Sequence, residues 1–64
     1  MNAVKAVRLA RRMMKKDVLD RSVGILTPHR LNQIEAGKGW RPRADEKASI
    51  AQILDCPENV LFPE

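Results

Sequence analysis

The apolar residues of this 64-residue chain recur at spacings of three and four, which place them on one face of an α-helix. Alternation of apolar and polar residues is never sustained, so the pattern does not predict β-strands. Glycines and prolines interrupt the helical pattern from Gly24 onward, and the apolar spacing predicts five short segments in all. We therefore predict a single all-α domain of five short helices over residues 1–64.

The first segment has an apolar arc opposite a basic arc. On a continuous helix, the apolar arc contains Ala3, Ala6, Val7, Leu9, Ala10, Met13 and Met14. The opposite arc contains Lys5, Arg8, Arg11, Arg12, Lys15 and Lys16. This basic arc is either an ordinary solvated face or a face that meets phosphates.

A second helix is predicted over about residues 15–23. Gly24 is its expected stop, because glycine accepts the left-handed conformation at the end of a helix. The side chains expected to face inward are those of Val18, Leu19 and Val23.

The third helix has the strongest boundary signals and is predicted over residues 28–36. Thr27 is a preferred N-cap, Pro28 occupies the favoured first helical position, and Gly37 follows the last turn. A helical wheel places Leu31, Ile34 and Thr27 on the inward side and Glu35 on its shoulder. The opposite face contains His29, Asn32, Gln33 and Ala36, with Pro28 and Arg30 at its margins.

The polar face of this third helix carries hydrogen-bonding groups and no carboxylate. Amide and guanidinium groups pair bidentately with the edges of adenine and guanine, and a single helix fits the major groove. An ordinary solvated helix more often mixes Glu and Lys. The face therefore favours DNA reading, with simple solvation as the alternative.

Two further helices are predicted after Pro42. Residues 44–54 place Asp45 and Glu46 in a first helical turn, where the helix dipole favours carboxylates. The apolar stripe of this segment contains Ile50, Ala51 and Leu54, widened by Ala48 and Ile53. The last segment, residues 57–62, is too short for Val60, Leu61 and Phe62 all to face inward.

The charge of the chain is divided along its length. The net charge is +4, but residues 1–43 contain eleven of the twelve Lys and Arg residues and only three acidic residues, a net +8. Residues 44–64 contain one Lys and five acidic residues, a net −4. One basic end suggests a polyanionic partner, although a solvated basic surface looks the same at this level.

Other classes of function find little support in the sequence. The chain has one histidine and one cysteine, no metal-ligand spacing and no glycine-rich phosphate loop, so we expect no enzyme, metal or cofactor. Cys56 is interpreted as a small buried apolar residue. The chain has no apolar run of membrane-spanning length and no signal peptide, so we expect a cytoplasmic protein with neither a membrane nor a small-molecule partner.

Two parts of the chain together resemble the Cro and phage-repressor family of helix-turn-helix proteins, also called the Xre family. The first is the capped third helix with Leu31, Ile34, Glu35 and Gly37, and the second is the segment SIAQILDCPENVLFPE at 49–64. The resemblance implies a lambda-repressor-like fold in which helices 2 and 3 form the helix-turn-helix. Helix 2 departs from the family pattern, because it opens with Lys15-Lys16-Asp17 and carries Asp20 where alanine is usual.

The resemblance also implies a role for individual residues. The expected base-reading residues are His29, Arg30, Asn32 and Gln33. The expected DNA-backbone contacts are Lys15, Lys16, Lys38, Arg41 and Arg43. The expected structural residues are Thr27, Leu31, Ile34, Gly37 and Glu35, whose ion-pair partner is Arg8 or Arg11. Trp40 is left open between core packing, a sugar-phosphate contact and a dimer contact.

The resulting functional prediction is sequence-specific binding of double-stranded DNA by a small Cro-like transcriptional repressor. A domain of this size has a small footprint, so we expect a homodimer on a palindromic operator, with residues 57–62 as a plausible contact. The alternatives are an antitoxin or phage adaptor that uses the same fold mainly to bind protein, and an excisionase-like architectural DNA binder. The expected setting is a bacterial or phage-infected cell.

Overall fold

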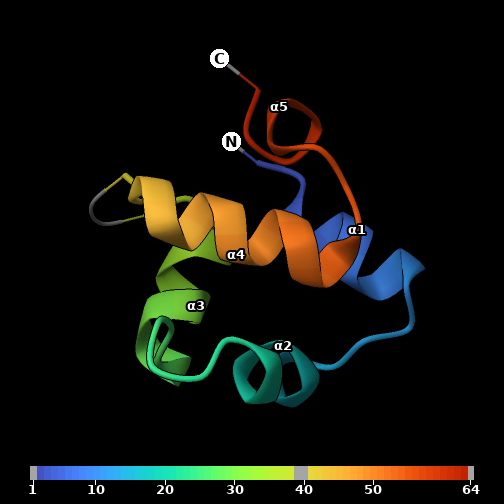
Figure 1. The fold of residues 1–64 in the computed structure, drawn as a ribbon. Helices are drawn as coiled ribbons and strands as arrows, with labels where there is room; N and C mark the ends of the chain where they lie inside the picture. Colours follow the sequence, from blue (N-terminus) through green and yellow to red (C-terminus); the bar gives the residue numbers. More distant parts are fainter. Residues whose placement is uncertain (1, 39–40, 64) are drawn as a thin grey trace.

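The computed structural model describes residues 2–38 and 41–63 and contains five α-helices (Figure 1). They are α1 (Val4–Ala10), α2 (Lys15–Arg21), α3 (Pro28–Ala36), α4 (Ala44–Leu54) and α5 (Glu58–Leu61). Within these residues there is no strand, so the prediction of an all-α fold with five short helices is confirmed. None of these helices is long and apolar enough to cross a membrane.

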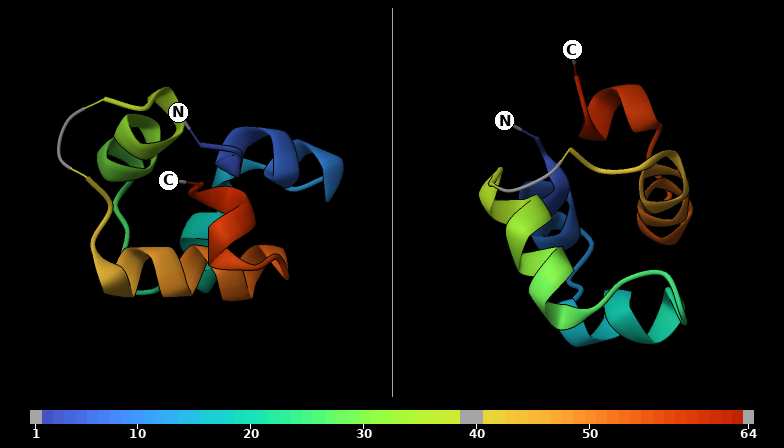
Figure 2. Two further views of the ribbon diagram at one scale, coloured as in Figure 1. Left: turned by 90° about the horizontal axis from the view of Figure 1, so that it is seen from above. Right: turned by 90° about the vertical axis from the view of Figure 1, so that its left-hand side faces the viewer.

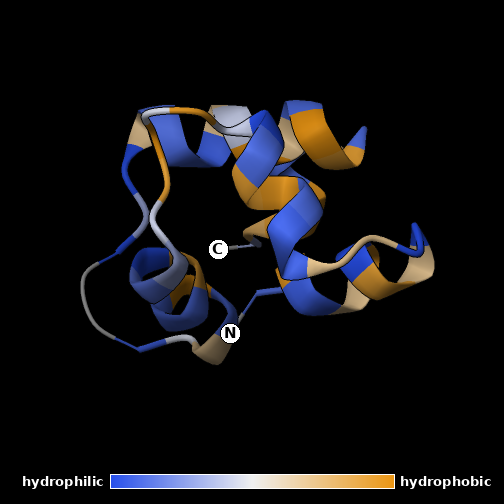
Figure 3. Cartoon of the chain, turned by 90° about the horizontal axis from the view of Figure 1, so that it is seen from below, coloured by the Kyte–Doolittle hydropathy of each residue, from blue (hydrophilic) through white to orange (hydrophobic). Residues whose placement is uncertain are grey.

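The core is shared evenly among the helices. Each helix contributes one side chain with no exposed surface: Val4, Val18, Leu31, Ile50 and Leu61. α4 packs against α1, α2 and α5, and α3 packs against α1 and α2, so the helices surround a common centre (Figures 1 and 2). The helices are mixed in hydropathy rather than apolar throughout (Figure 3), as expected when each buries only one side.

The predicted boundaries of α3 and α4 are confirmed. The Oγ1 of Thr27 accepts a hydrogen bond from the backbone N–H of Arg30 at 3.1 Å, which is the contact expected of an N-cap. Gly37 ends α3 in the left-handed conformation, with φ of +71°. α4 covers residues 44–54 as predicted. Thr27 itself is exposed rather than inward, because it precedes the helix and the helical wheel does not apply to it.

The predicted arcs of α1 are wrong in part. The buried side chains of this helix are Val4 and Arg8, one turn apart, whereas Leu9 is 56% exposed and Met14 is 70% exposed. The helix ends at Ala10, and Arg12 takes a positive φ of +57°, so residues beyond it no longer continue the same face. The basic residue Arg8 faces inward because Glu35 offers it a buried partner.

Arg11, another member of the basic arc, makes contacts within the fold. Its Nε donates to the carbonyl oxygen of Leu54 at 2.9 Å, and its Nη2 donates to that of Asp55 at 3.2 Å. These carbonyls lie at the C-terminal end of α4, where helix carbonyls lack partners within the helix. Two of the six cations of the basic arc, Arg8 and Arg11, therefore form contacts with other parts of the fold.

The second helix is shorter than predicted. α2 ends at Arg21, and Val23 lies in the following turn with 83% of its surface exposed, so its predicted inward position is wrong. Gly24 has a φ of +78°, the left-handed conformation expected of it, but it lies in the turn rather than directly at the helix end. The turn returns the chain to the core at Leu26, which is buried.

Both ends of the chain meet beside α5 (Figure 1). The backbone N–H of Ala3 donates to the carbonyl of Leu61 at 2.8 Å. Leu61 is fully buried, Phe62 is half-buried and Val60 is 51% exposed, so the prediction that these three residues do not all face inward is confirmed. Cys56 is half-buried against the core. Trp40 lies outside the described residues.

Candidate nucleic-acid interface

The outer face of α3 is a polar stripe. His29, Asn32 and Ala36 are exposed and Gln33 is half-buried, and these four positions follow the spacing of one helix face. The opposite side is fixed in the core by Leu31 and Ile34. Because Leu31 and Ile34 lock the rotation of the helix, the imidazole and the two amides are presented in a defined direction.

The C-terminal end of α3 is held by the start of the chain. The Nδ2 of Asn2 donates to the carbonyl of Ile34 at 2.7 Å, and its Oδ1 accepts from the N–H of Val4 at 3.1 Å. One side chain thus bonds the carbonyl of Ile34, which also accepts from the N–H of Gly37, and a free N–H at the start of α1. This role of Asn2 was not predicted from the sequence, in which its position before an apolar segment was the available signal.

Lys15 and Asn32 are brought together by the packing of α2 on α3. The Nζ of Lys15, the first residue of α2, lies 2.7 Å from the Oδ1 of Asn32, and both residues are exposed. A predicted backbone contact and a predicted base-reading residue therefore share one surface. Lys16 is exposed next to Lys15.

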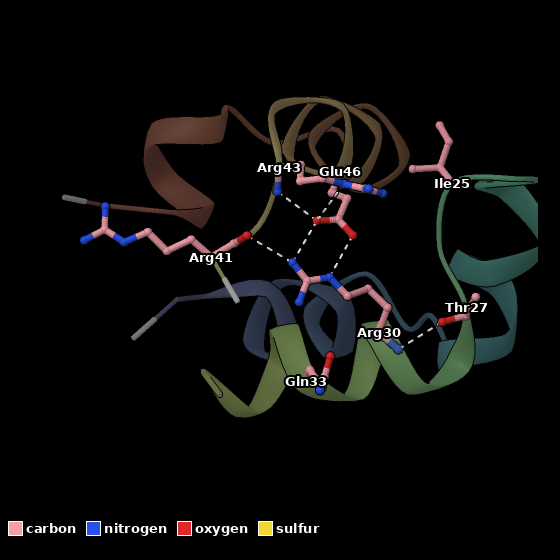
Figure 4. A pocket seen from close by; sticks show the side chains of 7 residues that line it. All are labelled: Ile25, Thr27, Arg30, Gln33, Arg41, Arg43 and Glu46. Carbon is pink, nitrogen blue, oxygen red and sulfur yellow. Dashed lines mark hydrogen bonds and ion pairs between the residues drawn. The ribbon is translucent and has the colours of Figure 1, made fainter. Parts of the chain in front are cut away.

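Arg30 is placed differently from the other predicted base-reading residues. Its Nε and Nη2 donate to the two carboxylate oxygens of Glu46 at 2.8 and 2.9 Å, and its Nη2 also lies 3.0 Å from the carbonyl oxygen of Arg41. The guanidinium is directed at α4 and the segment before it (Figure 4). From the sequence Glu46 was expected only as a first-turn acid, and its ion pair with Arg30 was not predicted.

The ion pair shifts the ionisation of both groups in the direction that favours charge. The hydrogen bond with Arg30 lowers the pKa of Glu46, and this effect outweighs the burial of the carboxylate, which acts in the opposite direction. The hydrogen bond with Glu46 raises the pKa of Arg30. The pair is therefore fully ionised at neutral pH.

The one carboxylate of α3 is buried in a second ion pair. Glu35 accepts from the Nε of Arg8 at 2.7 Å, with side chains that are 4% and 7% exposed respectively. Of the two partners that the sequence left open, the structure selects Arg8. The carboxylate on α3, Glu35, is thus neutralised by Arg8. The carboxylate that contacts α3 from α4, Glu46, is neutralised by Arg30.

A pocket of about 380 Å³ lies between α3 and the start of α4. Figure 4 shows the side chains that line it, among them Gln33, Arg41 and Arg43. Arg41 and Arg43 are exposed, and the guanidinium of Arg43 lies 3.5 Å from the exposed carboxylate of Asp45. The pocket thus joins the polar face of α3 to the exposed cations of residues 41–43. Lys38, at the other end of α3, is exposed as well.

Comparison of the chain with protein-family models, with curated proteins and with solved structures found no match in any of the three.

Proposed function

We propose that the protein binds double-stranded DNA in a sequence-specific manner and that α3 enters the major groove. The observation that carries this proposal is the polar stripe of exposed His29 and Asn32 and half-buried Gln33, which offers donors and acceptors and no carboxylate. Such groups are suited to reading base edges, which the major groove presents in a distinct pattern for each base pair. An ordinary solvated helix would have little reason to bury its only carboxylate with Arg8.

In this proposal α2, the turn and α3 act as a helix-turn-helix of the lambda-repressor-like kind. Its support is that α2 and α3 pack together and that Lys15, at the start of α2, reaches Asn32 on α3. In such motifs the second helix reads the bases while the first crosses the DNA backbone. Lys15 and Lys16 are then placed to meet phosphates on one side of α3.

The roles of the polar side chains follow from their contacts. We assign base reading to His29, Asn32 and Gln33. Contacts to the phosphate backbone are assigned to Lys15, Lys16, Lys38, Arg41 and Arg43. We do not assign base reading to Arg30, because its guanidinium is already engaged by Glu46 and by the carbonyl of Arg41. Phosphate contacts fix the position of the protein on the duplex, whereas base contacts specify the sequence.

A small Cro-like repressor that acts as a homodimer on a palindromic operator fits this proposal best. One 64-residue domain covers few base pairs, and two-fold dimers read two half-sites about one helical turn apart. The exposed Val60 and half-buried Phe62 on α5 offer an apolar contact for a second copy. Phe62 and Lys47 also line a pocket of about 310 Å³ at that surface.

Selection from a library of random-sequence duplexes tests the proposal directly. The protein is incubated with the library, the retained duplexes are sequenced, and the enriched sequence is then compared with a scrambled duplex in a salt-titrated gel shift. We expect an enriched motif with two-fold symmetry. Retention without enrichment would exclude sequence-specific regulation, and no retention at low salt would exclude DNA binding altogether.

A further inference from the structure

The exposed segment 41–43 is joined to α3 through a single ion pair. The Nη2 of Arg30 donates to the carbonyl of Arg41 at 3.0 Å, and the Oε1 of Glu46 accepts from the backbone N–H of Arg43 at 2.8 Å. Arg30 and Glu46 are themselves joined by two hydrogen bonds of 2.8 and 2.9 Å. These two main-chain contacts therefore depend on this pair (Figure 4), whereas the carbonyl of Arg43 accepts from the N–H of Lys47 at 2.9 Å in the first turn of α4.

The pair is internal, whereas the cations that it positions are external. The side chain of Glu46 is 1% exposed and that of Arg30 is 17% exposed, compared with 68% for Arg43. In Figure 4 the carbonyl of Arg41 is directed at Arg30, while its guanidinium extends away from the pair. The pair thus fixes the backbone, while the guanidinium of Arg41 extends outward and the exposed guanidinium of Arg43 lies 3.5 Å from the carboxylate of Asp45 and 3.8 Å from that of Glu46.

Glu46 also limits the charge that α3 presents. Sequence-independent binding to DNA grows with the number of cations that displace counterions from phosphates. An arginine at the margin of α3 without a buried carboxylate would add one such cation beside the base-reading face. Because discrimination is a difference between two affinities, lowering non-specific attraction increases it as effectively as improving specific contacts.

We propose that Glu46 is a positioning residue for DNA binding, which acts through Arg30 and the backbone N–H of Arg43. It holds segment 41–43 at a fixed place beside α3 and keeps the Arg30 charge away from phosphates, so that specific binding exceeds non-specific binding by a larger factor. This inference rests on the proposed function of α3.

Two variants test the inference in salt-titrated gel shifts with the selected duplex and a scrambled duplex of equal length. Glu46→Gln keeps the side-chain volume and removes the charge. It is expected to reduce the ratio of specific to non-specific affinity about tenfold and to steepen the slope of log K against log salt by about one. Asp55→Asn, which removes an exposed negative charge at the far end of α4, is the matched control and should change neither.

The double variant Arg30→Met with Glu46→Met separates positioning from direct contact. It keeps the net charge and leaves no buried charge unpaired, so it is expected to fold even if Glu46→Gln does not. A positioning role predicts reduced discrimination with an unchanged salt slope. A slope flattened by about one would mean that Arg30 contacts a phosphate directly, and a loss confined to one base pair would mean that it reads a base. Either result overturns the inference.

The wild-type protein, measured in the same titration, distinguishes a failure of the proposed function from a failure of the proposed role of Glu46. If it does not discriminate between the duplexes, the proposed function fails and the role of Glu46 fails with it. If it discriminates and both variants retain its ratio and its slope, only the role of Glu46 is wrong. Thermal unfolding of each variant is measured to verify that the assay temperature lies below the unfolding midpoint of that variant.

Discussion

Arg8 of α1 and Glu35 of α3 form a buried, bidentate ion pair. Their Nε and Oε2 atoms lie 2.7 Å apart and their Nη2 and Oε1 atoms 3.2 Å apart, with both side chains less than a tenth exposed. The Nη1 of Arg8 also donates to the carbonyl of Met13 at 2.9 Å. One guanidinium thus joins α1, the turn that follows it and the end of α3, so the orientation of α3 depends on this pair.

Removing one partner of this pair is expected to destabilise the domain strongly. Arg8→Ala leaves the Glu35 carboxylate buried without its partner, and such losses cost about 3–5 kcal/mol. That is a large part of the stability of so small a domain, and urea unfolding followed by circular dichroism measures it. Lys5→Ala, at an exposed position of the same helix, is the control and should change stability by less than about 0.5 kcal/mol. Equal effects of the two variants would contradict a structural role for the pair.

The parts of the fold that follow from local signals were predictable from the sequence. α3 begins after Thr27 and ends before Gly37 because each boundary is determined by residues in direct succession. The boundaries of α4 were equally accessible. The polar stripe of α3 also followed from local spacing, since Leu31 and Ile34 define the opposite side.

The positions that depend on distant partners were not predictable in this way. Arg8 lies on a basic arc by spacing, but its partner is 27 residues away. The contact of Arg11 with the end of α4 spans 43 residues. A helical wheel contains no information about these partners, and it also fails where a helix ends early, as it does before Val23. The ion pair of Arg30 with Glu46 was missed for the same reason, because Glu46 is on another helix.

Stability is expected to fall in acid because of Glu46. Its pKa lies below the usual 4.5 in the folded protein, so its contribution to stability is complete above about pH 4.5 and is lost as the pH falls through the lowered value. Urea unfolding at a series of pH values measures this loss. Glu46→Gln should show a shallower decline, whereas Asp45→Asn, at a mostly exposed carboxylate, should follow the wild type. If Glu46→Gln declines as steeply as the wild type, the carboxylate is not the source of the acid sensitivity.

Arg11→Ala is expected to lower stability without affecting DNA binding. The variant removes two charge-assisted hydrogen bonds to carbonyls at the C-terminal end of α4, which we expect to cost about 1–2 kcal/mol. Thermal unfolding measures the cost, and Arg21→Ala, at an exposed position of α2, serves as the control. The salt slope for DNA should remain that of the wild type. A flatter slope would add Arg11 to the phosphate-contacting residues.

Gln33→Ala is expected to relax the sequence preference at one base pair of each half-site. Gln33 is a half-buried member of the α3 stripe that also lines the pocket, and an amide can donate and accept at a single base. Loss of such a contact costs about 1–3 kcal/mol with the preferred duplex. Repeating the library selection with the variant measures the change. Gln52→Ala, an exposed position of α4, should leave the selected motif unchanged.

Arg43→Ala is expected to weaken binding to all duplexes by a similar factor. The side chain of Arg43 is 68% exposed, with contacts of 3.5 and 3.8 Å to the carboxylates of Asp45 and Glu46, and we expect it to meet a phosphate rather than a base. Loss of one phosphate contact flattens the slope of log K against log salt by about one and leaves the preferred sequence unchanged. Salt-titrated gel shifts with the selected and scrambled duplexes measure both quantities, and Arg21→Ala removes the same charge at the end of α2. If Arg21→Ala flattens the slope as much as Arg43→Ala does, the effect reflects net charge alone and segment 41–43 has no special contact with the backbone.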